Sequence, residues 1–368
     1  MLAACASEPA PQATAEQAVS ASAGRHFQHI FFIMMENHGT AEIIGNTADA
    51  PFINSLAGQG GVAMQYFGVT HPSLPNYLSM FSGYFQGIFD DCRAGADVTC
   101  SPEEFVPDSG DATDVVTLSP EQIASASATP HMFDGDNLVD RLEDHGLTWT
   151  AYMQSIPSTG ATVEYWPYDP VTGAPRKLYA QKHNPFEYFS DVRNDPARMQ
   201  KIVEASQLQA DLDANTVPDF VWLSPDQCHD MHGVSAANAA ALGIPECGGT
   251  DSQVIRLGDD YLRQTVSAIE SSRAWQQDSA IVIAWDEDDY AGFDGCCGSP
   301  TLPDGTILGG ARAPAIVLTS KAPAHKVSNQ PSNHYSLLAT IEQLWQLDCL
   351  GETCNMGSAD TLTDLFMP

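Results

Sequence analysis

Side chains with oxygen donor atoms follow two short apolar runs of this chain. The runs cover residues 30–35 and 280–285, and the side chains that follow them are Glu36, Asn37, Asp286 and Glu287. Such runs, rich in branched and aromatic residues, are typical of strands buried on both faces of a sheet. In open α/β sheets, ligands bind just beyond the carboxyl ends of these strands. Carboxylate and carboxamide oxygens there would hold a hard divalent cation. Solvated strand ends or helix caps would also explain either pair alone.

A serine lies between a strand-like run and a helix-like run. The segment THPSLPNY occupies residues 70–77 and contains Ser73. Pro75 suits the first turn of a helix, so Ser73 is expected near a helix N-terminus, where N–H groups and the dipole favour an anion. A serine there is commonly only an N-cap. In the functional interpretation, Ser73 is a metal-activated alkoxide that attacks phosphorus, and Asn76 donates a hydrogen bond to a phosphate oxygen.

Alternating strand-like and helix-like segments must position these residues. Strands are expected at 28–35, 62–67, 148–153, 219–223, 280–285 and 314–319, and helices at 75–82, 137–145, 197–213, 253–271 and 335–347. This alternation predicts an α/β fold with a largely parallel central sheet and helices on both faces. Residues from about 86 to 132 break the pattern and are expected to form an irregular insertion. We therefore expect one domain over residues 25–368.

The charge of the chain excludes one class of partner. The 368 residues carry 47 acidic and 15 basic side chains, a formal charge of −32. This balance argues against a nucleic-acid partner, which would require basic patches. It would also repel an anionic substrate at long range, so phosphate chemistry would need local positive charge from a metal or from histidines. An acidic, solubilising surface explains the overall charge without any partner.

The first residues resemble an export signal. Leu2-Ala3-Ala4-Cys5 is similar to the lipobox of bacterial lipoproteins, although the basic and apolar segments that usually precede it are missing. This predicts an exported protein: a periplasmic or cell-surface lipoprotein, with possible membrane attachment through a lipidated Cys5, or a secreted protein. A chance match of four small residues is the alternative. Residues 1–24 are expected to comprise this start and a disordered tether.

Eight further cysteines suggest disulfides in an exported chain. The local pairs are Cys92/Cys100, Cys228/Cys247 and Cys349/Cys354, and the adjacent Cys296 and Cys297 could form a vicinal bridge or pair elsewhere. No C-x-x-C pair of the kind found in structural zinc sites appears.

From about residue 28 to 348, the chain resembles the phosphoesterase family of acid phosphatases and phospholipases C. The motifs that carry the resemblance are Glu36-Asn37, HPSLPNY at 71–77, KHNPF at 182–186, DQCHDMH at 226–232, WDE at 285–287 and NHYS at 333–336. Several separated motifs in the same order make the match specific.

The resemblance implies an alkaline-phosphatase-like fold and a set of site residues. Glu36, Asn37, Asp286 and Glu287 match the metal ligands, and Ser73 matches the nucleophile. His183, Asp230, His232 and His334 match positions that line the phosphate. Two departures concern the wall that faces the substrate: Gln154 stands where glutamate is expected, and His229 stands where asparagine is expected.

The histidines leave two metal arrangements open. As protonated phosphate donors they predict an acidic pH optimum and a single divalent cation. A second metal on Asp230, His232 and His334 would instead favour neutral or alkaline pH by lowering the pKa of a bound water. The sequence favours one cation, of unspecified identity.

The sequence therefore predicts a metal-dependent phosphomonoesterase of the acid phosphatase type with a phosphoseryl intermediate. Its substrate would be a phosphoester, with a phospholipid or phosphoinositide among the candidates. The alternative is a phosphodiesterase of the phospholipase C type. Such an enzyme needs room for a second ester group, which the 86–132 insertion could supply or block. A third hypothesis, a non-catalytic lipid-anchored binding protein, is opposed by the intact Glu36, Ser73 and Asp286.

Overall fold

A computed structural model describes residues 26–103, 117–321 and 325–367. At its centre lies an eight-stranded sheet with the strand order β11-β2-β10-β9-β1-β8-β4-β7. The strands are β1 (His29–Met35), β2 (Gly61–Ala63), β4 (Trp149–Met153), β7 (Ile202–Glu204), β8 (Phe220–Ser224), β9 (Ser279–Trp285), β10 (Ala315–Thr319) and β11 (Lys326–Ser328). β10 is antiparallel to both of its neighbours, and the other pairs are parallel. The predicted α/β class with a largely parallel sheet is confirmed.

The two strands with oxygen-bearing ends are direct neighbours. β1 and β9 pair in parallel, with Met35 opposite Trp285 at their carboxyl ends. Every residue of β9, and every residue of β1 after His29, is buried. Because the two strands end in register, Glu36 and Asp286 leave the sheet at the same level. The Asp286 N–H donates to the Met35 carbonyl at 3.0 Å, which extends the ladder to this point.

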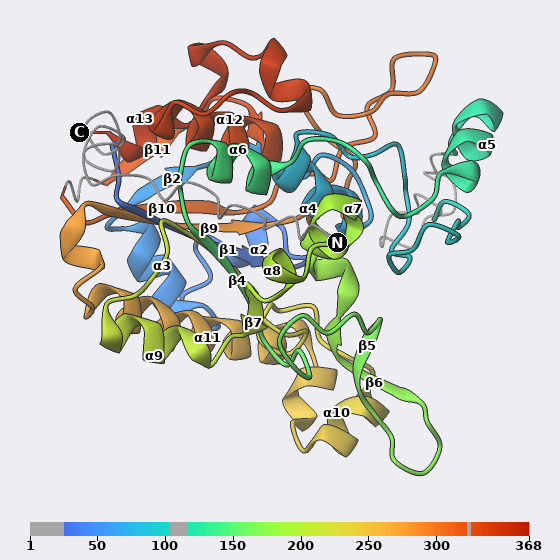
Figure 1. The fold of residues 1–368 in the computed structure, drawn as a ribbon, viewed down its shortest axis with the longest axis horizontal. Coiled ribbons are helices and arrows are strands. Elements are labelled where there is room, and N and C mark those ends of the chain that lie inside the picture. Colours follow the sequence, from blue (N-terminus) through green and yellow to red (C-terminus); the bar gives the residue numbers. More distant parts are fainter. Residues whose placement is uncertain (1–25, 104–116, 322–324, 368) are drawn as a thin grey trace, which may run out of the picture.

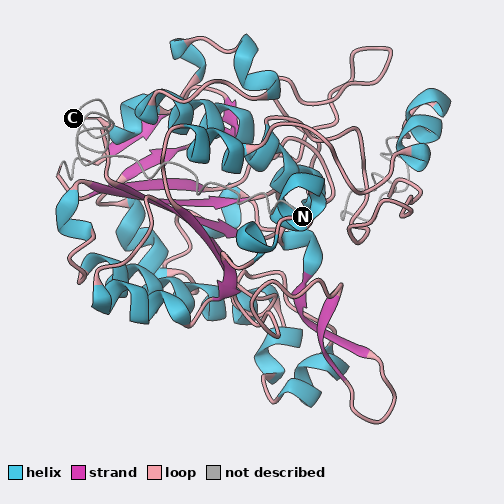
Figure 2. Cartoon of the chain, viewed as in Figure 1, coloured by secondary structure: helices cyan, strands magenta, loops and turns pink. Residues whose placement is uncertain are grey.

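Helices cover both faces of the sheet (Figures 1 and 2). One face carries α3 (Pro51–Ala57), α9 (Gln207–Ala214) and α11 (Asp251–Glu270), and the other carries α4 (Ser73–Ser82), α6 (Leu138–Asp144) and α12 (His334–Trp345). Shorter helices are α2 (Thr40–Ile43), α5 (Pro120–Ala128), α7 (Ser190–Arg193), α8 (Pro196–Met199), α10 (Ala236–Leu242) and α13 (Thr363–Phe366). Two small sheets pair β3 (Tyr66–Phe67) with β12 (Ser332–Asn333), and β5 (Tyr165–Tyr168) with β6 (Pro175–Ala180).

The helix of greatest importance for the site is α4, which is buried at all ten positions. It begins at Ser73 and ends at Gly83, which takes the left-handed conformation with φ of 70°. A Cβ at Gly83 would lie 2.1 Å from the Leu350 carbonyl oxygen, so only glycine fits this helix end. Burial on every side holds α4, and with it Ser73, in one position.

Two of the expected elements are wrong. Residues 197–213 do not form one helix: α8 and α9 flank β7, whose Ile202 and Val203 pair with β4. The short apolar sequence of β7 gains more by extending the sheet than by continuing a helix, which illustrates how tertiary pairing overrides propensity. The run 62–67 is likewise divided, because β2 joins the central sheet while β3 pairs with β12.

The described parts of the 86–132 segment, 86–103 and 117–132, contribute α5 and no strand to the central sheet. That this segment is an insertion in a single domain stays a prediction, as does the tether, because Cys5 and residues 1–24 lie outside the described residues. Among the helices that the structure describes, none combines the length and apolar composition that a membrane crossing requires.

Four disulfides join cysteines that are close in sequence. They are Cys92–Cys100, Cys228–Cys247, Cys296–Cys297 and Cys349–Cys354, with sequence separations of 8, 19, 1 and 5 residues. The three local pairs predicted from sequence are confirmed, and the adjacent cysteines form the vicinal bridge.

Candidate active site

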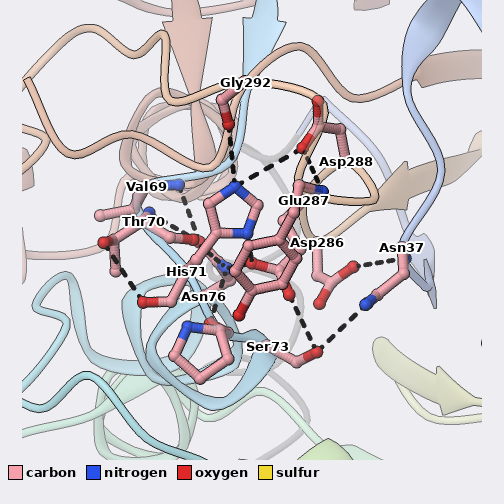
Figure 3. A network of polar contacts seen from close by, with 12 residues as sticks. Asn37, Val69, Thr70, His71, Ser73, Asn76, Asp286, Glu287, Asp288 and Gly292 are labelled. Atoms are coloured by element: carbon pink, nitrogen blue, oxygen red, sulfur yellow. Dashed lines mark hydrogen bonds and ion pairs between the residues drawn. The ribbon is translucent and has the colours of Figure 1, made fainter. Parts of the chain in front are cut away.

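Buried carboxylates gather where β1 and β9 end. Glu36, Asp286 and Glu287 are completely buried. The Asn37 backbone N–H donates to Asp286 Oδ1 at 3.1 Å, which ties the two strand ends together. Figure 3 shows the side chains of Asn37, Asp286 and Glu287 facing Ser73. The four residues predicted as metal ligands therefore meet at one edge of the sheet.

The hydroxyl of Ser73 lies at the centre of this group. Its Oγ is 2.9 Å from Glu36 Oε2, 3.2 Å from Glu287 Oε1 and 3.3 Å from Asn37 Oδ1. One hydroxyl has a single proton to donate, so at most one of these three oxygens receives a full hydrogen bond. The arrangement has more acceptors than donors, and it is one that a cation would complete.

Ser73 is not an N-cap. The N-cap residue of α4 is Pro72, and Ser73 is the first residue of the helix. The N–H of the next residue, Leu74, donates instead to Asp91 Oδ1 at 2.9 Å. The Ser73 hydroxyl therefore does not cap the N-terminus of α4, and it points to the carboxylates of Glu36 and Glu287. The helix N-terminus behind it favours negative charge at this point.

Burial, together with repulsion from neighbouring carboxylates, raises the pKa of two of these carboxyl groups. Burial and the neighbouring charge of Glu36 raise the pKa of Asp286 well above its usual range. Burial, with the charges of Asp91 and Glu36, does the same to the pKa of Glu287. Although burial opposes it, the positive charge of His183 and Lys182 holds the pKa of Glu36 below its usual range. Three ionised carboxylates cannot share this site without additional positive charge.

The donor set fits a hard divalent cation. Asp286 Oδ2 is buried and has no hydrogen-bond partner, although buried carboxylate oxygens normally do, and the buried Glu36 Oε1 has only an ion-pair contact of 3.3 Å with His183 Nε2. The available ligand atoms are all oxygens, as Mg²⁺, Ca²⁺ and Mn²⁺ prefer. Among the described residues, the one compact group of three His, Cys, Asp or Glu side chains is Asp90, Cys92 and Cys100, whose cysteines form a disulfide. The oxygens around Ser73 are more widely spaced, and Asn37 and Ser73 itself complete their set.

Lys182 supplies the positive charge that sequence reasoning missed. Its Nζ donates to Ser73 Oγ at 3.1 Å and to Asp91 Oδ2 at 2.7 Å. Although burial works against the charged form, Asp91 and Glu36 raise the pKa of Lys182 above its usual range, so the side chain is a permanent cation. Asp91 also accepts from the Leu74 N–H, so it fixes Lys182 over the start of α4. The only signal in the sequence is its position beside His183 in KHNPF.

His183 and Asp230 form a buried pair next to Glu36. His183 Nε2 lies 3.3 Å from Glu36 Oε1, and His183 Nδ1 lies 3.3 Å from Asp230 Oδ2. The His183 ring stacks on Tyr77 with 5.2 Å between centroids. Although burial opposes it, Glu36 and Asp230 raise the pKa of His183 to about 9. Burial raises the pKa of Asp230 to about 7 against the opposing effect of His183.

His232 lies at the exposed side of the site. Its Nε2 is 3.5 Å from Lys182 Nζ, its backbone N–H donates to Asp230 Oδ1 at 2.8 Å, and its Nδ1 is 3.0 Å from the Gly233 carbonyl. The structure thus places His232 next to Lys182, whose ammonium group also contacts Ser73. Its predicted contact with phosphate stays a prediction.

Asn76 and His334 stand behind the reacting groups. The Asn76 amide accepts from the Val69 and Thr70 N–H groups at 2.7 and 3.2 Å and donates to the Thr70 carbonyl at 2.7 Å. His334 is bonded at both ring nitrogens, to Tyr66 Oη at 2.7 Å and to the Asp286 carbonyl at 2.6 Å. The geometry supports a positioning function for both: Asn76 closes the loop before Ser73, and His334 holds the backbone of Asp286.

His71 is a second residue whose function sequence reasoning missed. Its Nδ1 lies 2.5 Å from Glu287 Oε2, and its Nε2 lies 3.2 Å from the Gly292 carbonyl (Figure 3). The ring stacks on Tyr290 with 4.0 Å between centroids. His71 therefore orients Glu287 from the loop that carries Ser73. Its place two residues before Ser73 was visible in the motif, but its partner, 216 positions away in sequence (287 − 71), was not.

The two departures from the family pattern lie around Asp226. Gln154 Oε1 accepts from the Asp226 N–H at 3.1 Å, and His229 Nδ1 lies 2.7 Å from Asp226 Oδ1. Neither residue has a hydrogen bond or ion pair with Ser73 or with the carboxylates around it among the described contacts. The departures affect the structure around Asp226 and leave the residues around Ser73 unchanged.

Comparisons with known proteins identify the family of this chain. The Phosphoesterase family profile matches residues 46–246 and 248–348. A phosphatidylinositol-3-phosphatase of Mycobacterium tuberculosis is 28% identical over 348 residues, which cover 95% of this chain and 86% of the relative. A probable acid phosphatase of Kluyveromyces lactis is 22% identical over 94% of this chain and 64% of its own length. An acid phosphatase of Aspergillus fumigatus is 20% identical, and the chain spans about half of it, 51%.

Solved structures share a lower sequence identity with this chain. A protein of the alkaline phosphatase superfamily from Vibrio parahaemolyticus has a TM-score of 0.47 and 12% identity, covering 90% of this chain and 70% of that one. A phosphonate monoester hydrolase of Agrobacterium radiobacter has a TM-score of 0.48 and 13% identity, covering 87% and 74%. Similarity at this level assigns no role to any residue. The family profile covers most of the chain, and on that basis the chain belongs to the Phosphoesterase family and is a phosphoric ester hydrolase.

Proposed function

We propose that this chain is a metal-dependent phosphomonoesterase of the acid phosphatase type, with Ser73 as its nucleophile. One observation carries the proposal: Ser73 Oγ lies between the oxygens of Glu36, Asn37 and Glu287 and the ammonium group of Lys182. The names of the fungal relatives support the acid phosphatase type, and the name of the mycobacterial relative makes a phosphoinositide a candidate substrate.

The residues of the chain would act in two steps. Ser73 Oγ forms a bond to phosphorus as the ester P–O bond breaks, which gives a phosphoserine and releases the alcohol. Water then attacks phosphorus, and Ser73 Oγ leaves. Catalysis of phosphoryl transfer depends chiefly on positioning and on neutralising the charge of the phosphoryl oxygens. Lys182 and the N-terminus of α4 lie where they can do this, since both are adjacent to Ser73.

One divalent cation would be held by Glu36, Asn37, Asp286 and Glu287. When bound, it would lower the pKa of the Ser73 hydroxyl and neutralise charge on the phosphoryl group. The buried Asp286 Oδ2, which has no hydrogen-bond partner, and the buried Glu36 Oε1, which contacts only His183 at 3.3 Å, are the observation that fits this group. His71 and His334 would then serve as supports that orient Glu287 and Asp286.

The same geometry favours one cation over two. A second site would need nitrogens of His232 and His334 together with Asp230. Both His334 nitrogens are engaged, with Tyr66 and with the Asp286 backbone. His232 Nε2 faces the Lys182 ammonium group, which would repel a second cation. The second-metal arrangement is therefore not part of the proposal.

Trapping the intermediate tests the proposed function. Enzyme mixed with p-nitrophenyl phosphate, quenched in acid and digested, is expected to contain phosphate on the peptide with Ser73, detected by mass spectrometry. Phosphorylation of His183 or His232 instead would overturn the assignment of the nucleophile. Parallel assays with p-nitrophenylphosphorylcholine test the diesterase alternative, and faster hydrolysis of this diester than of the monoester would replace the proposed specificity.

Replacing Lys182 by methionine is expected to lower kcat for p-nitrophenyl phosphate by about 10²–10³-fold, the usual cost of removing one group that stabilises transition-state charge. The apolar stem is kept and only the ammonium group is lost. Lys201→Met is the matched control, because Lys201 is partly exposed and pairs with Glu143 away from the site. Steady-state kinetics with both variants measure the effect. Equal kcat values in the two variants would show that Lys182 is a structural partner of Asp91 only.

A further inference from the structure

A cavity of about 570 Å³ adjoins the nucleophile. It is lined by Asp91, Glu103, Tyr165, Lys177, Lys182, Gln227, His232, Gly233, Val234, Ser235 and Asn238. Its walls come from β5, β6, α10, the loop at 227–235 and the beginning of the 86–132 segment. The volume lies within the range of sites that enclose a small molecule. We refer to this cavity as the lateral pocket.

Lys182 joins the lateral pocket to the nucleophile. It lines the pocket, and its Nζ is 3.1 Å from Ser73 Oγ. His232 also lines the pocket and lies 3.5 Å from the same ammonium group. A phosphoryl group at Ser73 would therefore have the pocket beside it, and the alcohol part of a phosphoester is the part that can extend into it. The lateral pocket is placed to hold the leaving group.

The lining is polar and balanced in charge. Apart from Gly233 and Val234, every lining side chain carries a hydrogen-bonding group. Amide, hydroxyl and carboxylate groups supply both donors and acceptors. Two lysines face two acids, and Asp91 is already bonded to Lys182 at 2.7 Å. An apolar leaving group would leave these groups without partners, and a leaving group with its own phosphate would meet Glu103 as well as Lys177, whose charges offset each other. A neutral group rich in hydroxyls satisfies the lining best.

A disulfide and a glycine hold one wall of the pocket in shape. Cys228 and Cys247 are bonded and buried, and the Val234 N–H donates to the Cys247 carbonyl at 2.9 Å. Gly233 has φ of 76°, and a Cβ there would lie 2.8 Å from the Cys247 carbonyl oxygen. Three lining residues, Gln227, His232 and Ser235, stand on or next to this loop. The wall is preformed, which is what selection among leaving groups requires.

We infer that the lateral pocket is a leaving-group subsite that selects uncharged, ring-sized polyols, so that the preferred substrates are monophosphates of sugars or cyclitols. This rests on the proposed function, because it assumes that the phosphoryl group is transferred to Ser73. A free polyol phosphate meets this description, whereas the headgroup of a phosphoinositide lipid carries an additional phosphodiester, and the experiment separates the two.

The test compares leaving groups of one size. The wild-type protein is expected to hydrolyse inositol monophosphate with a kcat/KM at least tenfold above that for cyclohexyl phosphate, which has the same ring without hydroxyls, and above that for inositol bisphosphate. A short-chain phosphatidylinositol monophosphate, whose leaving group carries a phosphodiester, forms the lipid arm: a lower kcat/KM than for inositol monophosphate is expected, and a higher one would show that the pocket does not select uncharged leaving groups. A preference for cyclohexyl phosphate or for the bisphosphate would overturn the inference.

A variant locates the selectivity in the pocket. Asn238→Leu removes one amide from α10 with little change in volume, and the ratio of kcat/KM for inositol monophosphate to that for cyclohexyl phosphate is expected to fall about three- to tenfold, the effect of one hydrogen bond. Gln209→Leu, on the exposed side of α9, is the matched control and should keep the wild-type ratio. An unchanged ratio in Asn238→Leu would contradict the inference. Loss of all hydrolysis in the wild type would refute the proposed function instead.

Discussion

Replacement of Ser73 by alanine is expected to reduce kcat for p-nitrophenyl phosphate by about 10⁴-fold or more, the scale seen when a catalytic nucleophile is removed. The hydroxyl is the one group at the start of α4 that reaches Glu36, Glu287 and Lys182 together. The substitution removes a single oxygen from a buried position and leaves the charges in place. Binding of inorganic phosphate should therefore persist, measured by isothermal titration calorimetry.

Ser82→Ala is the matched control for this prediction. Ser82 is also buried, lies on the same helix and donates only to backbone carbonyls of Leu78 and Tyr84. It should retain turnover with a small loss of stability. If Ser73→Ala turned over substrate at the rate of Ser82→Ala, Ser73 would not be the nucleophile. If both variants lost turnover, disruption of α4 would explain the result. Detection of phosphate on the Ser73 peptide of the wild-type protein would then decide whether Ser73 is the nucleophile.

The second large effect concerns the cation. Dialysis against a chelator is expected to abolish activity, and one divalent ion per chain should restore it. Asp286→Asn should lower kcat by about 10²–10³-fold, because it removes a charge from the group that would hold the cation and stabilise the transition state. Binding should also raise the melting temperature, since a ligand at 100 times its Kd stabilises the folded state by about 2.7 kcal/mol. Elemental analysis and thermal unfolding measure metal content and stabilisation without reference to activity.

Glu342→Gln controls for the loss of a buried carboxylate. Glu342 is buried on α12 and contacts no residue of the candidate site among its described hydrogen bonds. The Glu342→Gln variant should bind one metal ion per chain, as the wild type is expected to do. Full activity in protein that elemental analysis shows to be free of divalent metal would refute the metal requirement. Two ions per active chain would refute the single site.

The strand ends could be predicted from sequence because the signal is local. Residues 30–35 and 280–285 are apolar without interruption, and such runs must be buried on both sides. That they are adjacent and in register could not be read from the chain, because pairing depends on the whole sheet. Ser73 was expected near a helix N-terminus because Pro75 suits a first turn, and it is the first residue of α4. Its roles in catalysis stay predictions that the proposed experiments address.

The residues that sequence reasoning missed are defined by contacts across long stretches of chain. Lys182 meets Ser73 and Asp91 only because the segment before His183 packs against α4. No periodicity or spacing marks a lysine for this position. The same holds for His71 and Glu287. His334 shows a different case: the family resemblance matched it to a position that lines the phosphate, and in the structure both of its ring nitrogens contact Tyr66 and the Asp286 carbonyl.

The four disulfides have a consequence for producing the protein. None of their cysteines lies in a strand of the central sheet, and the longest sequence separation that they join is 19 residues. In the chain-entropy account, a bridge that closes a loop of about 15 residues stabilises the folded state by about 3 kcal/mol, but none of these bridges ties one strand of the sheet to another. We expect a bacterial cytoplasm, where thiols stay reduced, to yield a folded sheet with a loosened rim around the lateral pocket. Oxidation after purification would then raise the melting temperature and change the substrate preference.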